Sequence, residues 1–260
     1  MKIRIASTLL ILMILLGCND TKKSTEQTDV ENKTEIPIKK TKLNEPVKKV
    51  STDFGGIWVN KKYVDKLLST KSPKKSQDIT PITMLVLPNV INKEVTIVYG
   101  FHEGTSGKVV QKNGHYEIHS AESDEPVQPF KLENDRIKIN KDEFIRVKDN
   151  ASKSNYNIAE QLLFAGKYDL EGKHIELTAD GKIKGWDAFP YYSVLMDYYD
   201  AGMQVDQIRL GKNFENSKLY GFDFKKNNLI IYELKCAKKS DPDFCEVVKF
   251  GKALHKLKKK

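Results

Sequence analysis

The side chains best suited to metal binding are five histidines and the acids beside them. His115, Glu117 and His119 alternate along a short apolar stretch, so in an extended chain they lie on one face and could ligate a metal ion. The polar, solvent-facing side of a half-buried strand explains the same alternation. The sequence therefore predicts no metal site, and no cofactor.

Catalysis would need a histidine and a carboxylate, or two carboxylates, that converge on a cleft. His102, which precedes Glu103, and His119 are candidates for a hydrolase, but spacing alone pairs neither of them with a particular acid. The sequence contains neither a Gly-X-Ser-X-Gly elbow nor a phosphate-binding glycine loop. Catalytic residues are therefore not assigned, and a non-enzymatic protein is the favoured prediction.

The densest aromatic stretch is the predicted surface for a ligand or a protein partner. Amphipathic rings bury a large area while their polar tips stay accessible, which suits the mouth of a binding site. The alternative is that the rings fill a β-barrel core and leave tyrosine hydroxyls at its rim. The residues concerned are Trp186, Tyr191, Tyr192, Tyr198 and Tyr199.

Two cysteines near the C-terminus, Cys236 and Cys245, are predicted to form a disulfide bond. Residues 237–244 between them include Asp241-Pro242, which favours a turn between two strands. Such a bond persists outside the cytoplasm. Metal ligation by the two cysteines with His255 is the alternative interpretation.

From Asp53 onward, short apolar runs alternate with turn residues at intervals of about eight to twelve residues, which is typical of an antiparallel β protein. In residues 94–101 the apolar side chains recur at every second position, so this strand is half-buried. Tight hairpins are predicted at Asn113-Gly114, Asp180-Gly181 and Asn227-Asn228. Further strands are predicted near residues 81–87, 127–132, 136–139, 144–147, 194–199, 205–210 and 247–250.

Two short helices interrupt the strands. Asn60 can cap the first, which ends before Pro73, and Asn155 can open the second. Each helix carries an apolar stripe that needs a sheet to cover, so both are predicted to plug or flank a barrel end. The stripes are Tyr63, Val64, Leu67 and Leu68 in the first helix, and Ile158, Ala159, Leu162 and Leu163 in the second.

Gly56-Ile57-Trp58 at the start of the first strand is similar to the Gly-X-Trp signature of lipocalins and related calycin barrels. This resemblance implies an antiparallel meander barrel in which the tryptophan packs across the closed end. A second Gly-X-aromatic start, Gly166-Lys167-Tyr168, follows the second helix. Either one enlarged barrel or two β halves would accommodate the chain. We predict two halves, residues 53–150 and 151–252, packed as one unit.

The N-terminus resembles an export signal. Lys2 and Arg4 precede an apolar run over residues 5–16, which is shorter than the roughly 20 residues that a membrane span requires. Leu15-Leu16-Gly17-Cys18 resembles the bacterial lipobox, which implies removal of residues 1–17 as a signal peptide and acylation of Cys18. An ordinary secretory signal with a chance cysteine is the alternative.

Residues 18–52 are polar and lack aromatic residues, so they are predicted to be a lipidated, disordered tether. A basic tail is predicted at 253–260. The formal excess charge of +9 lies in the signal, this tether and residues 249–260, since residues 53–248 hold 28 basic and 29 acidic residues. Arginine is scarce, and no nucleic-acid partner is predicted. The tail lysines either contact anionic lipids or are solvated.

Together these patterns predict a non-enzymatic envelope lipoprotein, held at a membrane by its lipid anchor, that binds a small apolar molecule or an envelope protein. The alternative is a cell-envelope hydrolase that uses carboxylate and histidine groups. Asn19 after the acylated cysteine resembles outer-membrane sorting, so the predicted location is the outer membrane.

Overall fold

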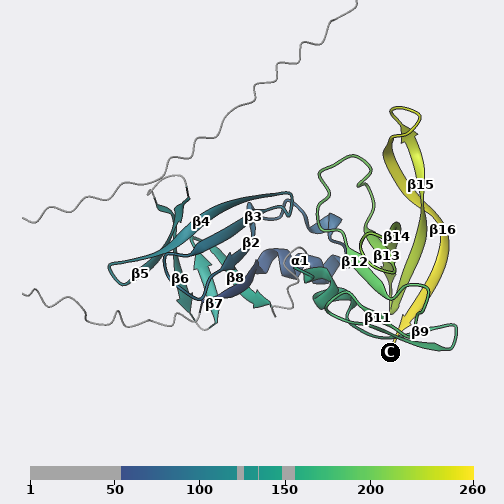
Figure 1. Ribbon diagram of the computed structural model, residues 1–260, viewed down its shortest axis with the longest axis horizontal. Helices are drawn as coiled ribbons and strands as arrows, with labels where there is room; N and C mark the ends of the chain where they lie inside the picture. Colours follow the sequence, from purple (N-terminus) through teal and green to yellow (C-terminus); the bar gives the residue numbers. More distant parts are fainter. Residues whose placement is uncertain (1–53, 122–125, 134, 148–155) are drawn as a thin grey trace, which may run out of the picture. The chain divides into compact units, whose positions relative to one another are not determined.

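The structure is a computed structural model that describes residues 54–121, 126–133, 135–147 and 156–260 (Figure 1). The predicted signal peptide, Cys18, the tether and Asn155 lie outside these residues. The described chain is mainly antiparallel β-sheet with two short helices and a single 3₁₀ turn, which confirms the predicted fold class. No helix in the described ranges is both long and apolar enough to cross a membrane.

The first eight strands form a closed antiparallel barrel in which each strand pairs with the next and β8 pairs back onto β1. Its interior is filled by buried apolar side chains from Phe54, Trp58, Val95, Phe130 and Phe144, among others. The barrel is therefore a packed core. Its strands are β1 (Gly56–Asn60), β2 (Ile82–Leu87), β3 (Glu94–Tyr99), β4 (Glu103–Lys112), β5 (His115–Ser120), β6 (Pro126–Glu133), β7 (Arg136–Ile139) and β8 (Asp142–Val147).

The tryptophan of the Gly-X-Trp start is fully buried in this barrel. Its Nε1 donates a hydrogen bond to the Phe54 carbonyl oxygen at 2.7 Å. The Arg146 guanidinium, on the strand β8 that closes the barrel, lies 4.6 Å from the centre of the Trp58 rings. This cation–π contact ties the first strand to the last, and the arrangement is consistent with a lipocalin-like barrel.

The other eight strands form a second antiparallel sheet in the order β11-β10-β9-β16-β15-β14-β13-β12. Its two outer strands approach each other, since the Tyr192 amide donates to the Gly181 carbonyl at 2.8 Å and Lys182 bridges to Tyr191. The sheet therefore curls almost into a second barrel. Its strands are β9 (Gly166–Leu170), β10 (Lys173–Leu177), β11 (Ile183–Lys184), β12 (Tyr191–Val194), β13 (Gln207–Gly211), β14 (Ser217–Lys225), β15 (Asn228–Lys239) and β16 (Cys245–Lys259).

The second sheet begins with the same local arrangement as the first. The Tyr168 hydroxyl donates to the Phe164 carbonyl four residues earlier, at 2.7 Å. The Lys259 ammonium lies 5.7 Å from the Tyr168 ring centre and comes from the last strand, β16, which pairs with β9. A buried aromatic ring, a carbonyl acceptor four residues before it and a cation from the final strand thus occur in both sheets.

Helix α1 (Lys61–Thr70) follows β1 directly and begins as predicted. The Asn60 side chain accepts a hydrogen bond from the Lys62 amide at 3.0 Å and donates to Thr80 and Ile82. The helix ends where Lys71 adopts a positive φ of 53°, and the 3₁₀ turn η1 (Lys74–Ser76) follows. Tyr63, Val64 and Leu67 of the predicted apolar stripe are buried, whereas Leu68, its fourth member, is exposed.

The second helical segment is shorter and wider than the predicted α-helix. Only residues 158–159 are α-helical, and they continue into a π-helical turn, η2 (Glu160–Phe164). Ile158, Ala159 and Leu163 are buried as the stripe predicts, whereas Leu162 is only partly covered.

Three local features differ from their predictions. The predicted strand 194–199 is wrong beyond Val194, since Asp197 accepts a hydrogen bond from the Tyr199 amide and turns the chain out of the sheet. The hairpin expected at Asn227-Asn228 is shifted by one residue, with the positive φ on Lys226. Residues 253–259, assigned to a basic tail, instead belong to strand β16, because Leu257 is buried between exposed lysines.

The disulfide and the hairpin at Asn113-Gly114 are both present as predicted. The Cys236 and Cys245 sulfurs are 2.10 Å apart, and the bond joins β15 to β16 near the end of their hairpin. Asn113 and Gly114 have φ values of 49° and 78° and connect the paired residues Lys112 and His115. Positive φ at both central residues is the conformation that this sequence favours.

Candidate functional site

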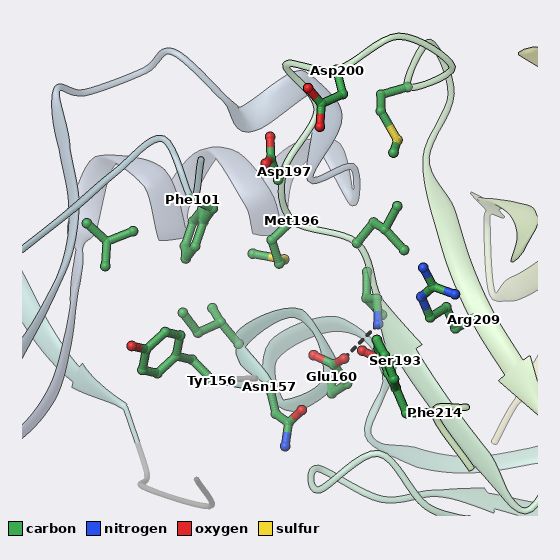
Figure 2. A pocket seen from close by; sticks show the side chains of 15 residues that line it. Phe101, Tyr156, Asn157, Glu160, Ser193, Met196, Asp197, Asp200, Arg209 and Phe214 are labelled. Atoms are coloured by element: carbon green, nitrogen blue, oxygen red, sulfur yellow. Dashed lines mark hydrogen bonds between the residues drawn. The ribbon is translucent and has the colours of Figure 1, made fainter. Parts of the chain in front are cut away.

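A pocket of about 320 Å³ is formed by the turn after β3, the residues around the start of η2, and the chain on either side of β12 and β13. We call it the junction pocket (Figure 2). The residues that line it are Val98, Phe101, Tyr156, Asn157, Ile158, Glu160, Ser193, Val194, Leu195, Met196, Asp197, Asp200, Met203, Arg209 and Phe214.

The walls of the junction pocket are mostly apolar, with Phe101 on one side and Met196 near its middle (Figure 2). Phe101 sits in the β3–β4 turn at a positive φ of 60°, a conformation that bulky residues rarely adopt. The turn is held by the Gly100 amide, which donates to the Thr83 hydroxyl at 2.9 Å, and the Phe101 ring packs on Tyr63 with centroids 5.1 Å apart. The fold therefore presents this ring to the pocket in a fixed position.

A buried acid, Glu160, lies at the base of the junction pocket and is only 1% exposed. It accepts a hydrogen bond from the Val194 amide at 2.7 Å, and the Ser193 hydroxyl also bonds to it. Burial raises the pKa of Glu160 to about 7, although these hydrogen bonds act in the opposite direction. Near neutral pH the carboxyl group therefore exists in both protonation states.

Arg209 is the cation of the junction pocket. It lies on β13 opposite Ser193 of β12, and its guanidinium carbon is 5.0 Å from the centre of the Phe214 ring. Within the described ranges, its side chain forms no ion pair with an acid. A planar guanidinium stacked on one aromatic ring keeps its edge available for a carboxylate or phosphate.

His102 and Asp197 form a pair at the rim, with Nδ1 and Oδ2 2.8 Å apart. Both side chains are 37% exposed. The hydrogen bond with Asp197 raises the pKa of His102, which favours the charged pair. The His102 ring also contacts the Tyr199 ring, at 5.0 Å between centroids. The group is thus a histidine, an aspartate and a tyrosine, and differs from a nucleophile, base and acid triad.

The five aromatic residues predicted as a binding surface do not gather on one face. Tyr192 and Tyr198 lie in the core, where the Tyr192 hydroxyl donates to the Thr178 carbonyl and the Tyr198 hydroxyl accepts from the Gln207 amide. For these two residues the structure shows the alternative, a core position. Tyr199 is exposed and hydrogen-bonds to Asp78.

The remaining two predicted residues lie apart from these tyrosines. Trp186 packs edge-on against Phe189 and His255, with centroid distances of 5.0 and 4.9 Å. Tyr191 is partly exposed on strand β12. None of the five predicted aromatic residues lines the junction pocket.

The pocket residues that matter most, Glu160, Arg209 and Phe101, were absent from the predicted site. One signal was readable for Glu160, since an acid stands between the apolar residues Ile158-Ala159 and Leu162-Leu163. Arg209 is one of only three arginines after Cys18, but its strand pattern gave no reason to place it near a pocket.

The alternating group on β5 does not form a three-residue site. The His119 Nε2 lies 2.8 Å from a Glu117 carboxylate oxygen, and His119 is buried. His115 is exposed at the hairpin end, where it pairs with Lys112. Across the residues that the structure describes, no three or more histidine, cysteine, aspartate and glutamate side chains converge as a metal site would require.

Comparisons with protein-family profiles, with curated proteins and with solved structures find no match to this chain.

Proposed function

We propose that this chain is a non-enzymatic binding protein of the bacterial envelope that holds a small, largely apolar molecule in the junction pocket. The observation that carries this proposal is the pocket itself, a concave, mostly apolar surface with a few polar groups at defined positions. Ligand sites in proteins have this composition, and at about 320 Å³ the pocket is near the lower end of the usual range of roughly 300–1,000 Å³.

The filled interior of the first barrel also supports a site outside it. Twelve buried apolar residues pack together there, including Trp58, Phe130 and Phe144. A ligand carried inside that barrel would have to displace them. The junction pocket needs no such rearrangement.

The hydrogen-bond partners of the acidic side chains favour binding over catalysis. Glu160 is engaged by the Val194 amide and Asp197 by His102, so neither is poised against a nucleophile. A hydrolase remains the second candidate, because His102 and Asp197 do lie within hydrogen-bonding distance. Both side chains are 37% exposed, so water reaches the pair, which argues against it.

The test uses three probes that share one apolar body: 4-phenylbutyrate, 4-phenylbutanol and 4-phenylbutylamine. Binding to the purified mature chain is measured by isothermal titration calorimetry. At least one probe is expected to bind. Met196→Trp, which places a larger side chain in the pocket, is expected to weaken that binding by about tenfold or more, since the pocket is small.

Leu254→Trp, at an exposed position on β16, is the control and is expected to bind as the wild type does. Circular dichroism of both variants establishes that they fold. The proposed function is wrong if none of the three probes binds, or if folded Met196→Trp binds as tightly as the control.

A further inference from the structure

We infer that the junction pocket selects small carboxylic acids, with the ligand carboxylate on Arg209 and its apolar body against Phe101 and Met196. This inference rests on the proposed function and adds the chemical class of the ligand. It depends on three observations: the position of Arg209, the partners of the neighbouring acids, and the size and lining of the pocket.

Arg209 is fixed by the sheet on both sides. Its backbone on β13 pairs with Ser193 of β12 and with Leu219 of β14, so the side chain leaves a rigid strand and not a loop. Phe214 covers the guanidinium at 5.0 Å. Among the described residues no carboxylate pairs with Arg209. A partly buried guanidinium with an aromatic ring on one face and no described carboxylate within ion-pair distance is well placed to bind an anion.

The acids of the pocket are engaged elsewhere. The Val194 amide and the Ser193 hydroxyl bond to Glu160, and Asp197 is paired with His102 and accepts from the Tyr199 amide at 3.1 Å. Asp200 is exposed. In Figure 2, Asp197 and Asp200 lie at one end of the pocket, away from Arg209. Water and these partners therefore satisfy the acids, whereas the cation is left for a ligand.

The ligand class follows from the lining. A guanidinium fork matches the two oxygens of a carboxylate, and charge-assisted hydrogen bonds of this kind are stronger than neutral ones. Phe101, Met196 and the neighbouring Tyr156 offer apolar contacts to the rest of the molecule. Methionine adapts its shape, so the pocket accepts aliphatic or aromatic bodies of modest size.

The head group is tested with the same three probes, measured at pH 7.5. The acid is expected to bind about tenfold or more tightly than the alcohol and the amine. Arg209→Gln is expected to remove this advantage, so that acid and alcohol bind about equally. Arg209→Lys keeps the positive charge but lacks the planar guanidinium group. Its preference for the acid over the alcohol is expected to lie between those of the wild type and Arg209→Gln.

Lys212→Gln removes a cation from the exposed β13–β14 turn, three residues from Arg209, and is the matched control. It is expected to leave the preference for the acid unchanged. The inference is overturned if the alcohol or the amine binds as tightly as the acid, or if Arg209→Gln, shown folded by circular dichroism, retains the preference. Tighter binding of the amine would assign recognition to Asp197 and Asp200. The absence of binding by all three probes would instead contradict the proposed function.

Discussion

At the scale of single residues, Glu160 is a buried carboxyl group whose pKa burial raises to about 7. It is almost completely buried, and its carboxyl group bonds to the Val194 amide on β12. This bond connects the start of η2 to the end of strand β12, after which the chain leaves the sheet and lines the pocket. Burial of a carboxylate costs free energy unless the group is protonated or fully hydrogen-bonded, and here both effects operate.

Glu160→Gln is predicted to change how stability depends on pH. The pKa of Glu160 is 4.5 as the unperturbed value and about 7 in the fold. Between these values the folded chain holds a proton that the unfolded chain has lost, so the free energy of unfolding falls as pH rises from 4.5 to 7. The fall is at most about 3 kcal/mol from this group. An amide does not titrate, so the variant should lack this contribution.

Urea unfolding at pH 4.5 and pH 7.5 measures this effect. The free energy of unfolding of Glu160→Gln minus that of the wild type should be larger at pH 7.5 than at pH 4.5. Glu215→Gln, at an exposed position in the β13–β14 turn, is the control for loss of one surface charge. A wild type and a Glu160→Gln variant with the same pH dependence would show that the fold does not shift this carboxyl group.

At the scale of elements, the β15–β16 hairpin extends beyond the sheet that it helps to form. Strand β14 pairs with β15 only as far as Tyr232, so residues 233–239 pair on one side alone, with β16. On the other side of β16, the Gly202 amide donates to Glu246 and Gln204 accepts from Val248. The disulfide closes this extension where the pairing register shifts.

The double variant Cys236→Ser with Cys245→Ser is predicted to loosen the extension while the sheet stays folded. A bond that closes so short a loop contributes about 2 to 3 kcal/mol on the chain-entropy model. Because the extension has few partners besides its own two strands, this loss should appear locally. Amide hydrogen exchange of residues 235–247 should become faster, and that of β13 should not change.

Reduction of the wild type should reproduce the same exchange pattern, which separates loss of the bond from the substitutions themselves. Equal acceleration in β13 and in the extension would contradict the prediction. It would mean that the disulfide supports the whole sheet.

At the scale of the whole molecule, one hydrophobic cluster spans both sheets, in addition to the separate cluster that fills the first barrel. A single cluster of buried side chains includes Ile57, Val59 and Val147 of the first barrel together with Phe222 and Leu257 of the second sheet. Helix α1 contributes Tyr63, Val64 and Leu67 to the same cluster. Neither sheet buries its apolar surface completely without the other, which ties the geometry of the junction pocket to the packing of both.

The proposed membrane anchor is also a property of the whole chain. Cells that express the full-length chain and grow with an alkyne analogue of palmitate should incorporate the label, and the chain should appear in the outer-membrane fraction. Cys18→Ala should abolish the label and release the chain from the membrane, because the acyl chains supply the attachment.

The variant that lacks Cys236 and Cys245 is the control for labelling of other cysteines, and it should remain labelled. A wild-type chain without label in the soluble fraction would contradict the anchor. Label that persists in Cys18→Ala would place acylation at another residue.

The sequence by itself determined the features that depend on neighbouring residues. Asn113-Gly114 requires positive φ at two successive positions, Asn60 caps the helix that follows it, and Cys236 and Cys245 lie on either side of a turn. Each depends on contacts across a few residues, which a pattern of residue types records directly. The lysine-rich C-terminus was predicted as a tail because local sequence does not record long-range pairing. Its strand is defined by pairing with β9 and β15.

Only the tertiary structure decided which side chains meet at the junction pocket. Phe101, Glu160 and Arg209 come from three segments far apart in the sequence. An alternating pattern states that a strand has two faces, but it does not state which other strand or turn covers each face. Tyr192 and Tyr198 became core residues and Arg209 a pocket residue for this reason: burial is set by long-range packing between the two sheets.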